Sequence, residues 1–275
     1  MTTWEFPCPD PAAIHISSWA SGSVAVSGEA TDVISVEVVP SSPRSNVDDL
    51  LEQVRVTFEN GRLAVKGPKK YGLRLRTGLD LTIKAPAGSD CQAHTAAADV
   101  SLVGQLGEVG LHTASGDVTV ASAGGAATVQ TASGDIFVDR ADADVRISTA
   151  SGDVQVGRAR GELRINAVSG DLEMGDVAGQ IDARTVSGDI AVRELSGGHA
   201  ELGTTSGDMR IMVKPGLGVY LDLSSLSGKV RSELDESSGD DLDEGDGPQD
   251  ATANVELRCR TVSGNVRISK SLAAA

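Results

Sequence analysis

The tripeptide Ser-Gly-Asp recurs every 18 residues through the middle of this 275-residue chain. Five copies begin at Ser115, Ser133, Ser151, Ser169 and Ser187. The spacing then loosens, and related tripeptides follow at Ser206-Gly207-Asp208, Ser227-Gly228-Lys229 and Ser263-Gly264-Asn265. A fixed short period is typical of an array of stacked units, each of which is too small to fold alone.

Each unit carries two short segments in which apolar residues alternate with other residues. Counted from the serine as position zero, apolar residues stand at +3 and +5, as in Val118 and Val120, and at −6 and −4, as in Val109 and Leu111. Because side chains alternate between the two faces of a strand, each pair marks the inward face of one β-strand. The unit therefore contains two strands.

Two turns separate these strands. In the first turn, glycine supplies a backbone conformation with positive φ, and Ser and Asp side chains can bond nearby amides. A second glycine column at +10 marks the other turn, with Gly125, Gly161, Gly179, Gly197 and Gly216. Two strands and two turns in 18 residues predict one rung of an all-β, single-stranded parallel β-solenoid, with rungs about 4.8 Å apart.

The handedness of the coil follows from a general rule. Crossovers between parallel strands are nearly always right-handed, so we expect a right-handed β-helix. The left-handed hexapeptide helix also uses 18 residues per coil but needs an aliphatic residue every six positions. Position +9 would be one of these, and it holds Gly124, Asp142, Arg160, Ala178 and Ser196. This mostly polar or small column argues against the left-handed alternative.

The repeat divides the chain into two regions. Residues 1–90 are rich in strand patterns but lie off the 18-residue register, and we interpret them as an irregular leading end that caps the first rung. Within them, Val47–Val54 is a candidate short helix, and Asn60-Gly61 predicts a hairpin turn between Val54–Phe58 and Leu63–Val65. Residues 91–275 form the solenoid, with an acidic disordered insertion near residues 232–251.

The charge excludes some partners. The net charge is −15, which argues against nucleic acid and against an anionic membrane surface. Nine acidic residues fall between Glu233 and Asp250, without a Lys or Arg among them. This stretch is interpreted as a solvated loop, and binding of a basic partner or of cations is the alternative.

The cysteines and the first residues of the chain give information on the cellular compartment of the protein. Cys8, Cys91 and Cys259 have no metal-binding or redox spacing, and Cys259 occupies an inward position, where it acts as a small apolar residue. The first residues lack the basic and apolar regions of a secretory signal, and no stretch is long enough to span a membrane. These features predict a cytoplasmic protein.

The aspartates of the repeat are the first candidate site. Stacked rungs would align one carboxylate per rung along an edge, formed by Asp99, Asp117, Asp135, Asp153, Asp171, Asp189 and Asp208. Such an edge would favour a divalent cation such as calcium, with Asp117, Asp135, Asp153, Asp171 and Asp189 as candidate ligands. The alternative is that each carboxylate bonds the amides of its own turn. The Gly-Gly-x-Gly-x-Asp calcium repeat is absent, which favours this alternative.

Two further candidates are a threonine column and an enzyme site. Threonine occupies position −2 in most rungs, at Thr113, Thr131, Thr149, Thr185, Thr204 and Thr261, and structural packing is favoured over a flat binding face. The four histidines lack metal-type spacing, and no Gly-x-Ser-x-Gly elbow occurs. A carbohydrate-active β-helix would need clustered carboxylates in a cleft, and most rungs have no insertion to build one. We therefore expect neither an enzyme nor a cofactor.

The repeated Thr-Ala-Ser-Gly-Asp-Val pattern, preceded by Leu81-Thr82-Ile83-Lys84-Ala85-Pro86-Ala87-Gly88, resembles a bacterial family of unknown function. That family is labelled putative adhesin and has β-strand repeats, and the resemblance covers roughly residues 10–270. It implies a solenoid and supplies no catalytic residues. The sequence thus predicts a non-enzymatic scaffold or interaction protein with a protein or surface partner. A cation-binding solenoid and a carbohydrate-active β-helix are the alternatives.

Overall fold

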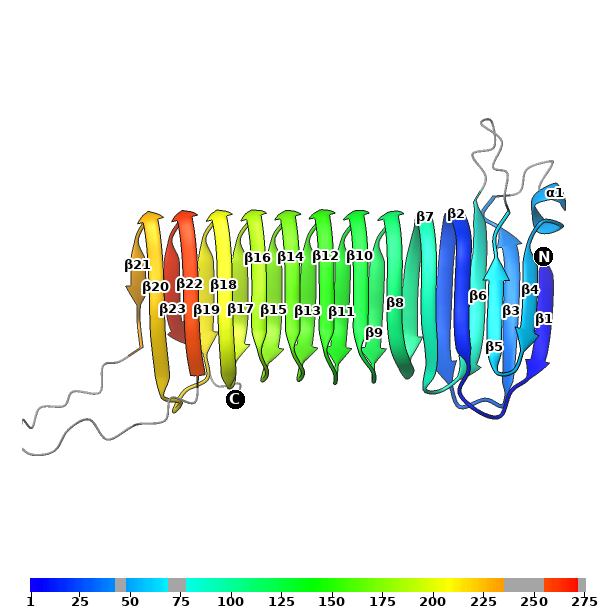
Figure 1. Ribbon diagram of the computed structural model, residues 1–275, viewed down its shortest axis with the longest axis horizontal. Coiled ribbons are helices and arrows are strands. Elements are labelled where there is room, and N and C mark those ends of the chain that lie inside the picture. The colour runs from blue at the N-terminus through cyan, green and yellow to red at the C-terminus, as the bar shows by residue number, and fades with distance from the viewer. Residues whose placement is uncertain (43–47, 69–77, 235–254, 272–275) are drawn as a thin grey trace, which may run out of the picture.

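The computed structural model of this chain describes residues 1–42, 48–68, 78–234 and 255–271. These residues form an elongated stack of β-strands with one short helix, α1 (Asp48–Leu51), at the N-terminal end (Figure 1). A single hydrophobic core runs through the stack from Cys8 to Ile268. The predicted all-β solenoid is confirmed, while the right-handed sense of its coil stays a prediction. Within the described residues, no helix is long and apolar enough to cross a membrane.

Each central rung contributes one strand to each of two faces. The first face, here called the β8 face, contains β8 (Leu106–Ser115), β10 (Ala127–Ser133), β12 (Val145–Ser151), β14 (Leu163–Ser169), β16 (Ile181–Ser187) and β18 (Gly198–Ser206). The second, the β9 face, contains β9 (Val118–Ala123), β11 (Ile136–Ala141), β13 (Val154–Ala159), β15 (Leu172–Val177), β17 (Ile190–Leu195) and β19 (Met209–Val213). Neighbouring rungs pair in parallel and in register, so that Ser133 lies between Ser115 and Ser151.

The core contains the columns that alternation predicts. Val154 and Val156 at positions +3 and +5, and Leu163 and Ile165 at −6 and −4, are at most 1% exposed. One further inward column lies at position +8 and holds Ala123, Ala141, Ala159, Val177 and Leu195. Strand alternation does not predict this column, because two consecutive outward-facing residues precede it and interrupt the two-residue period of the side chains.

The Ser-Gly-Asp corner requires glycine for two reasons. Gly152 has a φ of 118°, in a region that L-residues rarely adopt. A Cβ atom on Gly152 would also lie 2.2 Å from the carbonyl oxygen of Gly134 in the preceding rung. The glycines of successive rungs therefore pack backbone against backbone, which sets the close approach of the rungs at this corner.

The parallel stack begins before the 18-residue register does. Strand β2 (Ala13–Glu29) runs along both faces and pairs in parallel with β7 (Ser89–Gly104) through most of its length. On its other side β2 pairs with β5 (Arg62–Lys66) and β6 (Leu79–Pro86), also in parallel. β2 is thus a complete rung, although it lies within the region assigned to the leading end. The boundary at residue 90 stays a prediction.

Antiparallel strands close the N-terminal end. Strand β3 (Val33–Pro40) lies between β1 (Thr2–Pro7) and β6, and β4 (Arg55–Glu59) pairs with β5. The turn between β4 and β5 contains Asn60 and Gly61 with φ values of 50° and 73°, as the sequence predicted for this hairpin. The predicted short helix is also present, as the four-residue α1.

The order of rungs at the C-terminal end differs from their order in the chain. Strands β20 (Val219–Ser227) and β21 (Val230–Ser232) form the outermost rung. The later strands, β22 (Val255–Ser263) and β23 (Val266–Lys270), lie between that rung and β18 and β19 (Figure 1). Most of the acidic insertion predicted near residues 232–251 lies outside the described residues. It links the outermost rung to the one inside it, an arrangement that sequence order does not predict.

The cysteines are buried and free. Cys91 and Cys259 are fully buried and Cys8 is 4% exposed, and none of them forms a disulfide. Burial raises the pKa of the Cys91 and Cys259 thiols to about 12, and burial likewise raises the pKa of Cys8. Because the thiolate is the reactive form, these side chains are apolar packing groups.

We expect all three thiols to resist alkylation at pH 8 in the folded protein and to react fully in denaturant. Counting modified cysteines by mass spectrometry after iodoacetamide treatment with and without urea checks this expectation. Fast modification of Cys91 in the native protein would contradict the burial described here.

Replacing Gly152 with alanine should destabilise the solenoid. Both the positive φ and the contact with the Gly134 carbonyl oppose a methyl group, so we expect a loss of at least about 1–3 kcal/mol in the free energy of unfolding. Urea unfolding followed by circular dichroism measures it. Gly203→Ala is the matched control, because the nearest atom to its new Cβ would be 3.7 Å away. Equal midpoints for the two variants would refute the argument.

Candidate functional site

The aspartate column joins the rungs through hydrogen bonds. The Oδ1 atom of each aspartate accepts a hydrogen bond from the backbone amide of the aspartate one rung later. The N–O distance is 2.9 Å from Asp153 to Asp135, and 2.8 Å from Asp171 to Asp153. The same contact recurs from Asp99 to Asp208 at 2.8–3.0 Å. The interpretation that each carboxylate bonds its own turn is therefore corrected. The bond runs between rungs, because an in-register stack brings the next corner amide within reach.

The pattern continues where the aspartate is replaced. The amide of Asn265 donates to Asp208 Oδ1 at 2.7 Å, and the amide of Lys229 donates to Asn265 Oδ1 at 3.1 Å. These two bonds also follow the spatial order of the last rungs. The corner thus requires an acceptor oxygen, and an amide oxygen serves as well as a carboxylate.

The candidate metal ligands each have one carboxylate oxygen engaged in this hydrogen bond; they are Asp117, Asp135, Asp153, Asp171 and Asp189. In the part of the chain that the structure describes, no group of three or more His, Cys, Asp or Glu side chains is arranged to hold a metal ion. Cation binding at this edge stays a prediction.

The threonine column faces inward. Thr113, Thr131 and Thr149 are 6–9% exposed, and each donates its hydroxyl to the carbonyl of the serine two residues later, at 2.8–2.9 Å. The column therefore closes the corner from inside the core, as the packing interpretation expected. It does not form an outer binding face.

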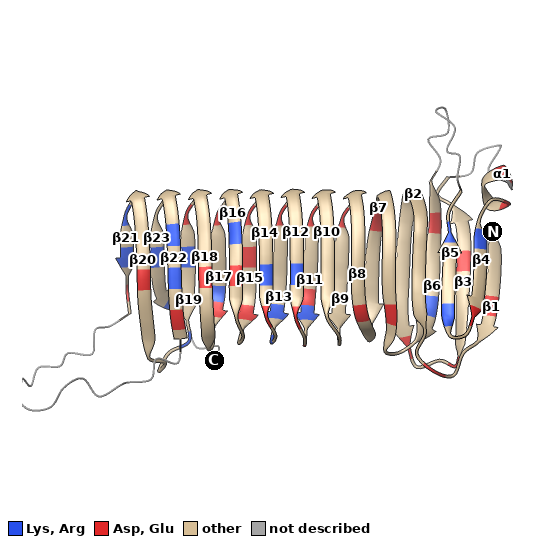
Figure 2. Cartoon of the chain, viewed as in Figure 1, with Lys and Arg blue, Asp and Glu red and all other residues tan. Residues whose placement is uncertain are grey.

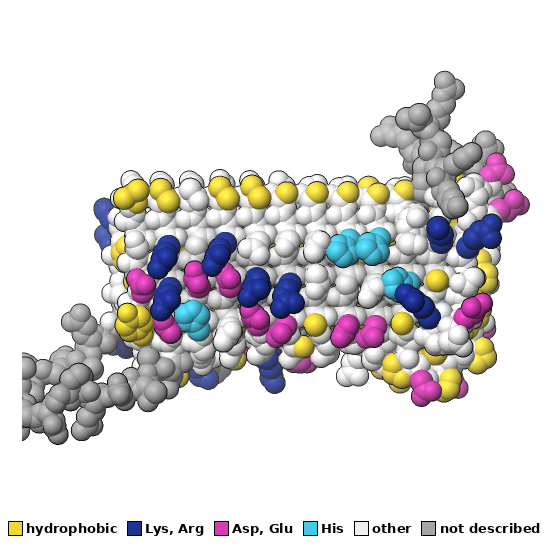
Figure 3. Space-filling model, in the orientation of Figure 1, with side chains coloured by type: hydrophobic (Ala, Val, Ile, Leu, Met, Phe, Trp, Pro, Cys, Tyr) yellow, Lys and Arg dark blue, Asp and Glu magenta, His cyan; other side chains and the backbone are white. Residues whose placement is uncertain are grey.

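An apolar ridge, which sequence analysis missed, runs along the outside of the same corner. The residue before each corner serine is exposed in every rung; in spatial order these residues are Ala114, Ala132, Ala150, Val168, Val186, Thr205, Val262 and Leu226. Their exposure reaches 53% for Val168 and 83% for Leu226. Figure 3 shows this ridge as a line of hydrophobic side chains along one long edge of the molecule. The sequence signal for this ridge is the mainly apolar composition of position −1, a position that strand alternation places on the surface.

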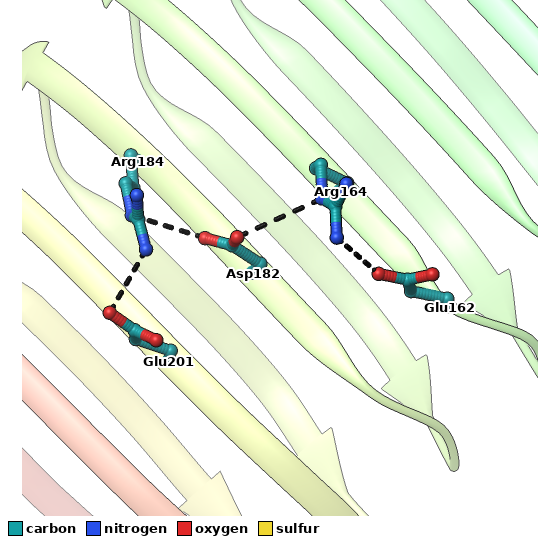
Figure 4. A network of polar contacts seen from close by, with 5 residues as sticks. All are labelled: Glu162, Arg164, Asp182, Arg184 and Glu201. Carbon is teal, nitrogen blue, oxygen red and sulfur yellow. Dashed lines mark hydrogen bonds and ion pairs between the residues drawn. The ribbon is translucent and has the colours of Figure 1, made fainter.

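Charged side chains on the β8 face neutralise one another. Arg164 contacts Glu162 at 2.6 Å and Asp182 at 3.8 Å, and Arg184 contacts Asp182 at 3.1 Å and Glu201 at 3.0 Å (Figure 4). Figure 2 shows such alternating charges across the C-terminal half of the face. These pairs are solvent-exposed, so each adds little stability. Their effect is to leave this half of the face without a strong field of either sign.

Three of the four histidines gather on the same face nearer the N-terminal end (Figure 3). The His94 and His112 rings are stacked with centroids 4.7 Å apart and planes 3° apart. His15, from β2, lines the same groove, which has a volume of about 700 Å³. The sequence could not bring these residues together, because the position of β2 in the stack was unknown.

The fold and surface define a regular parallel β-solenoid whose repeated corner residues are structural. The chain belongs to the Toastrack DUF4097 family, whose model matches residues 13–269. This finding confirms the resemblance drawn from the repeat. No curated protein matches the chain.

Several solved structures are similar to this chain at low sequence identity. A putative adhesin from Bacteroides fragilis NCTC 9343 is 12% identical with a TM-score of 0.44, over 97% of this chain and 96% of that one. A putative adhesin from Parabacteroides distasonis ATCC 8503 is 13% identical with a TM-score of 0.36, over 97% and 96%. A putative lipid binding protein from the latter organism is 10% identical with a TM-score of 0.37, over 98% and 96%.

Two substitutions at Asp153 separate a structural role from cation binding. Asp153→Ala removes the acceptor for the Asp171 amide and should cost about 1 kcal/mol in the free energy of unfolding. Asp153→Asn keeps an acceptor oxygen, as Asn265 does, and should unfold near the wild-type midpoint. Urea unfolding with calcium or with chelator measures both effects. A calcium-dependent gain in wild-type stability that Asp153→Asn abolishes would instead establish a cation site.

Proposed function

We propose that this protein is a non-enzymatic scaffold that binds another protein along its apolar ridge. The observation that supports this proposal is a row of exposed apolar side chains at the spacing of the rungs, which Thr205 interrupts once. The row consists of Val168, Val186, Val262 and Leu226. Soluble proteins rarely leave extended apolar surface without a partner. Transfer of three valine side chains from water into an interface would contribute several kcal/mol before the cost of association.

The surroundings of the ridge suggest the chemistry of its partner. The aspartate column lies on the same corner, three residues after the ridge residue in the rungs from Asp117 to Asp208, and its side chains from Asp117 to Asp171 are exposed. A partner segment that matches both rows would carry apolar residues flanked by lysine or arginine. Electrostatic complementarity of this kind favours the partner's orientation and its rate of association.

The regularity of the corner supports a scaffold over an enzyme. The repeated aspartates accept backbone hydrogen bonds between rungs, and the repeated threonines close the corner from inside. These contacts keep successive rungs in register, so that the ridge residues of neighbouring rungs are separated by the same distance along the repeat. A long and regular surface is what solenoids offer to extended partners.

Capture of partners from lysate of the source cell tests the proposal. The ridge variant Val168→Ser/Val186→Ser/Val262→Ser should lose a specific protein partner that the wild type enriches, by roughly tenfold or more. The matched control is Val103→Ser/Phe137→Ser/Tyr220→Ser, which removes exposed apolar side chains away from the ridge and should retain the partner. Quantitative mass spectrometry reads out the enrichment. The same partners on wild type and ridge variant, or none on the wild type, would exclude this function.

A further inference from the structure

The groove that contains the three histidines is separate from the apolar ridge. It lies on the β8 face and crosses β5, β2, β7, β8 and β10, with a volume of about 700 Å³. Its lining includes the small residues Ala13, Gly110 and Ala126, and polar side chains rise around them. The volume falls within the range of sites that hold small molecules in proteins.

The register of the strands explains the hollow. His15 on β2 lies opposite Gln92 on β7, Gln92 lies opposite Gly110 on β8, and Gly110 lies opposite Thr128 on β10. Gly110 therefore removes one side chain from the middle of a row that is otherwise filled. Its backbone is outside the left-handed region, and an added Cβ would meet only Gln92 Cγ, at 3.5 Å. The fold does not require a glycine at this position, so the open space has no structural purpose.

Polar groups around the hollow have free hydrogen-bonding capacity. Among the described residues, the side chains of Arg62, Gln92 and Glu108 form no hydrogen bond or ion pair, whereas Arg164 and Arg184 on the same face are paired. Asp90 uses Oδ1 to accept the Glu108 amide at 2.7 Å, which leaves its second oxygen available. Donors and acceptors therefore converge on one space without satisfying one another.

Arg62 places one positive charge at the β2 and β5 side of the groove. Partial burial lowers the pKa of His15, and the nearby Arg62 guanidinium and His94 lower it further. Arg62 itself lines the groove, so its guanidinium would attract an anionic group there. The carboxylates of Asp90 and Glu108 line the groove as well, so its ligand must also satisfy acceptor oxygens.

We propose that this groove binds an acidic saccharide, with a sugar carboxylate on Arg62 and sugar hydroxyls on Asp90, Gln92 and Glu108. Arginine binds carboxylates through paired hydrogen bonds, and hydroxyls donate to carboxylates and accept from amides. The stacked imidazoles of His94 and His112 line the same groove and would contact the bound sugar. Inorganic phosphate near neutral pH has only one or two hydroxyl donors and no ring, so it could not satisfy the two acidic side chains and Gln92 together while bound to Arg62. The site is independent of the ridge and of the partner proposed for it.

Calorimetric titration of the full chain tests this site with three probes: tri-galacturonate, the neutral trisaccharide maltotriose, and inorganic phosphate. We expect heat only with tri-galacturonate. Arg62→Gln should weaken binding by roughly tenfold or more, because one charge-assisted contact is lost. Gly110→Phe should abolish binding, because the ring fills the hollow.

Two matched variants control for non-specific effects. Arg231→Gln removes an exposed arginine at the other end of the solenoid, and Gly203→Phe adds a ring on the same face outside the groove, at a glycine with comparable space. Both should bind tri-galacturonate within about twofold of the wild type, a change below 0.5 kcal/mol. Thermal melting verifies that each variant is folded, and Arg62→Gln keeps the test decisive if Gly110→Phe does not fold.

Three outcomes would overturn the proposal. The first is no heat from wild type with tri-galacturonate. The second is unchanged affinity in a folded Gly110→Phe or in Arg62→Gln. The third is phosphate or maltotriose binding as tightly as tri-galacturonate, because the site would then recognise only an anion or only a sugar.

Discussion

The stack depends on one contact repeated at every corner, the hydrogen bond from a backbone amide to the Oδ1 atom of the preceding rung. A buried or crowded amide without an acceptor is costly, and the glycine beside it leaves no room for water between rungs. The carboxylate can accept this amide hydrogen bond only if the next rung is parallel and in register. The corner therefore fixes both the spacing of the rungs and their alignment, and the inward valines and isoleucines follow from that alignment.

This corner also determines what the outer surface presents. Because each rung repeats the last, a side chain placed outside the corner once is placed there in every rung, and Val168, Val186 and Val262 become a line instead of scattered residues. The same regularity makes departures informative. Gly110 interrupts a filled row on the β8 face, and the space it leaves is surrounded by unpaired polar groups. Regular columns therefore build surfaces, and one irregular position leaves a hollow in them.

Much of this architecture was predictable from the sequence, and the limits have physical causes. The inward columns at +3, +5, −4 and −6 follow from alternation, and the hairpin at Asn60-Gly61 follows from its turn residues. Alternation could not predict the column at +8, because the strand departs from the period of two just before Ala159. The groove was also out of reach, since it needs His15 beside a strand that begins at Ser89.

Rung order was unpredictable for a related reason, which has a consequence for folding. Ser263 aligns equally with Ser206 and with Ser227, so one register serves either order. During synthesis, residues 219–232 leave the ribosome before residues 255–270 and could pair first with β18 and β19, in the place that the later rung finally occupies. The last rung must then displace an earlier one. Assembly of this solenoid therefore cannot be a simple addition of rungs from one end, and its final step waits for nearly the whole chain.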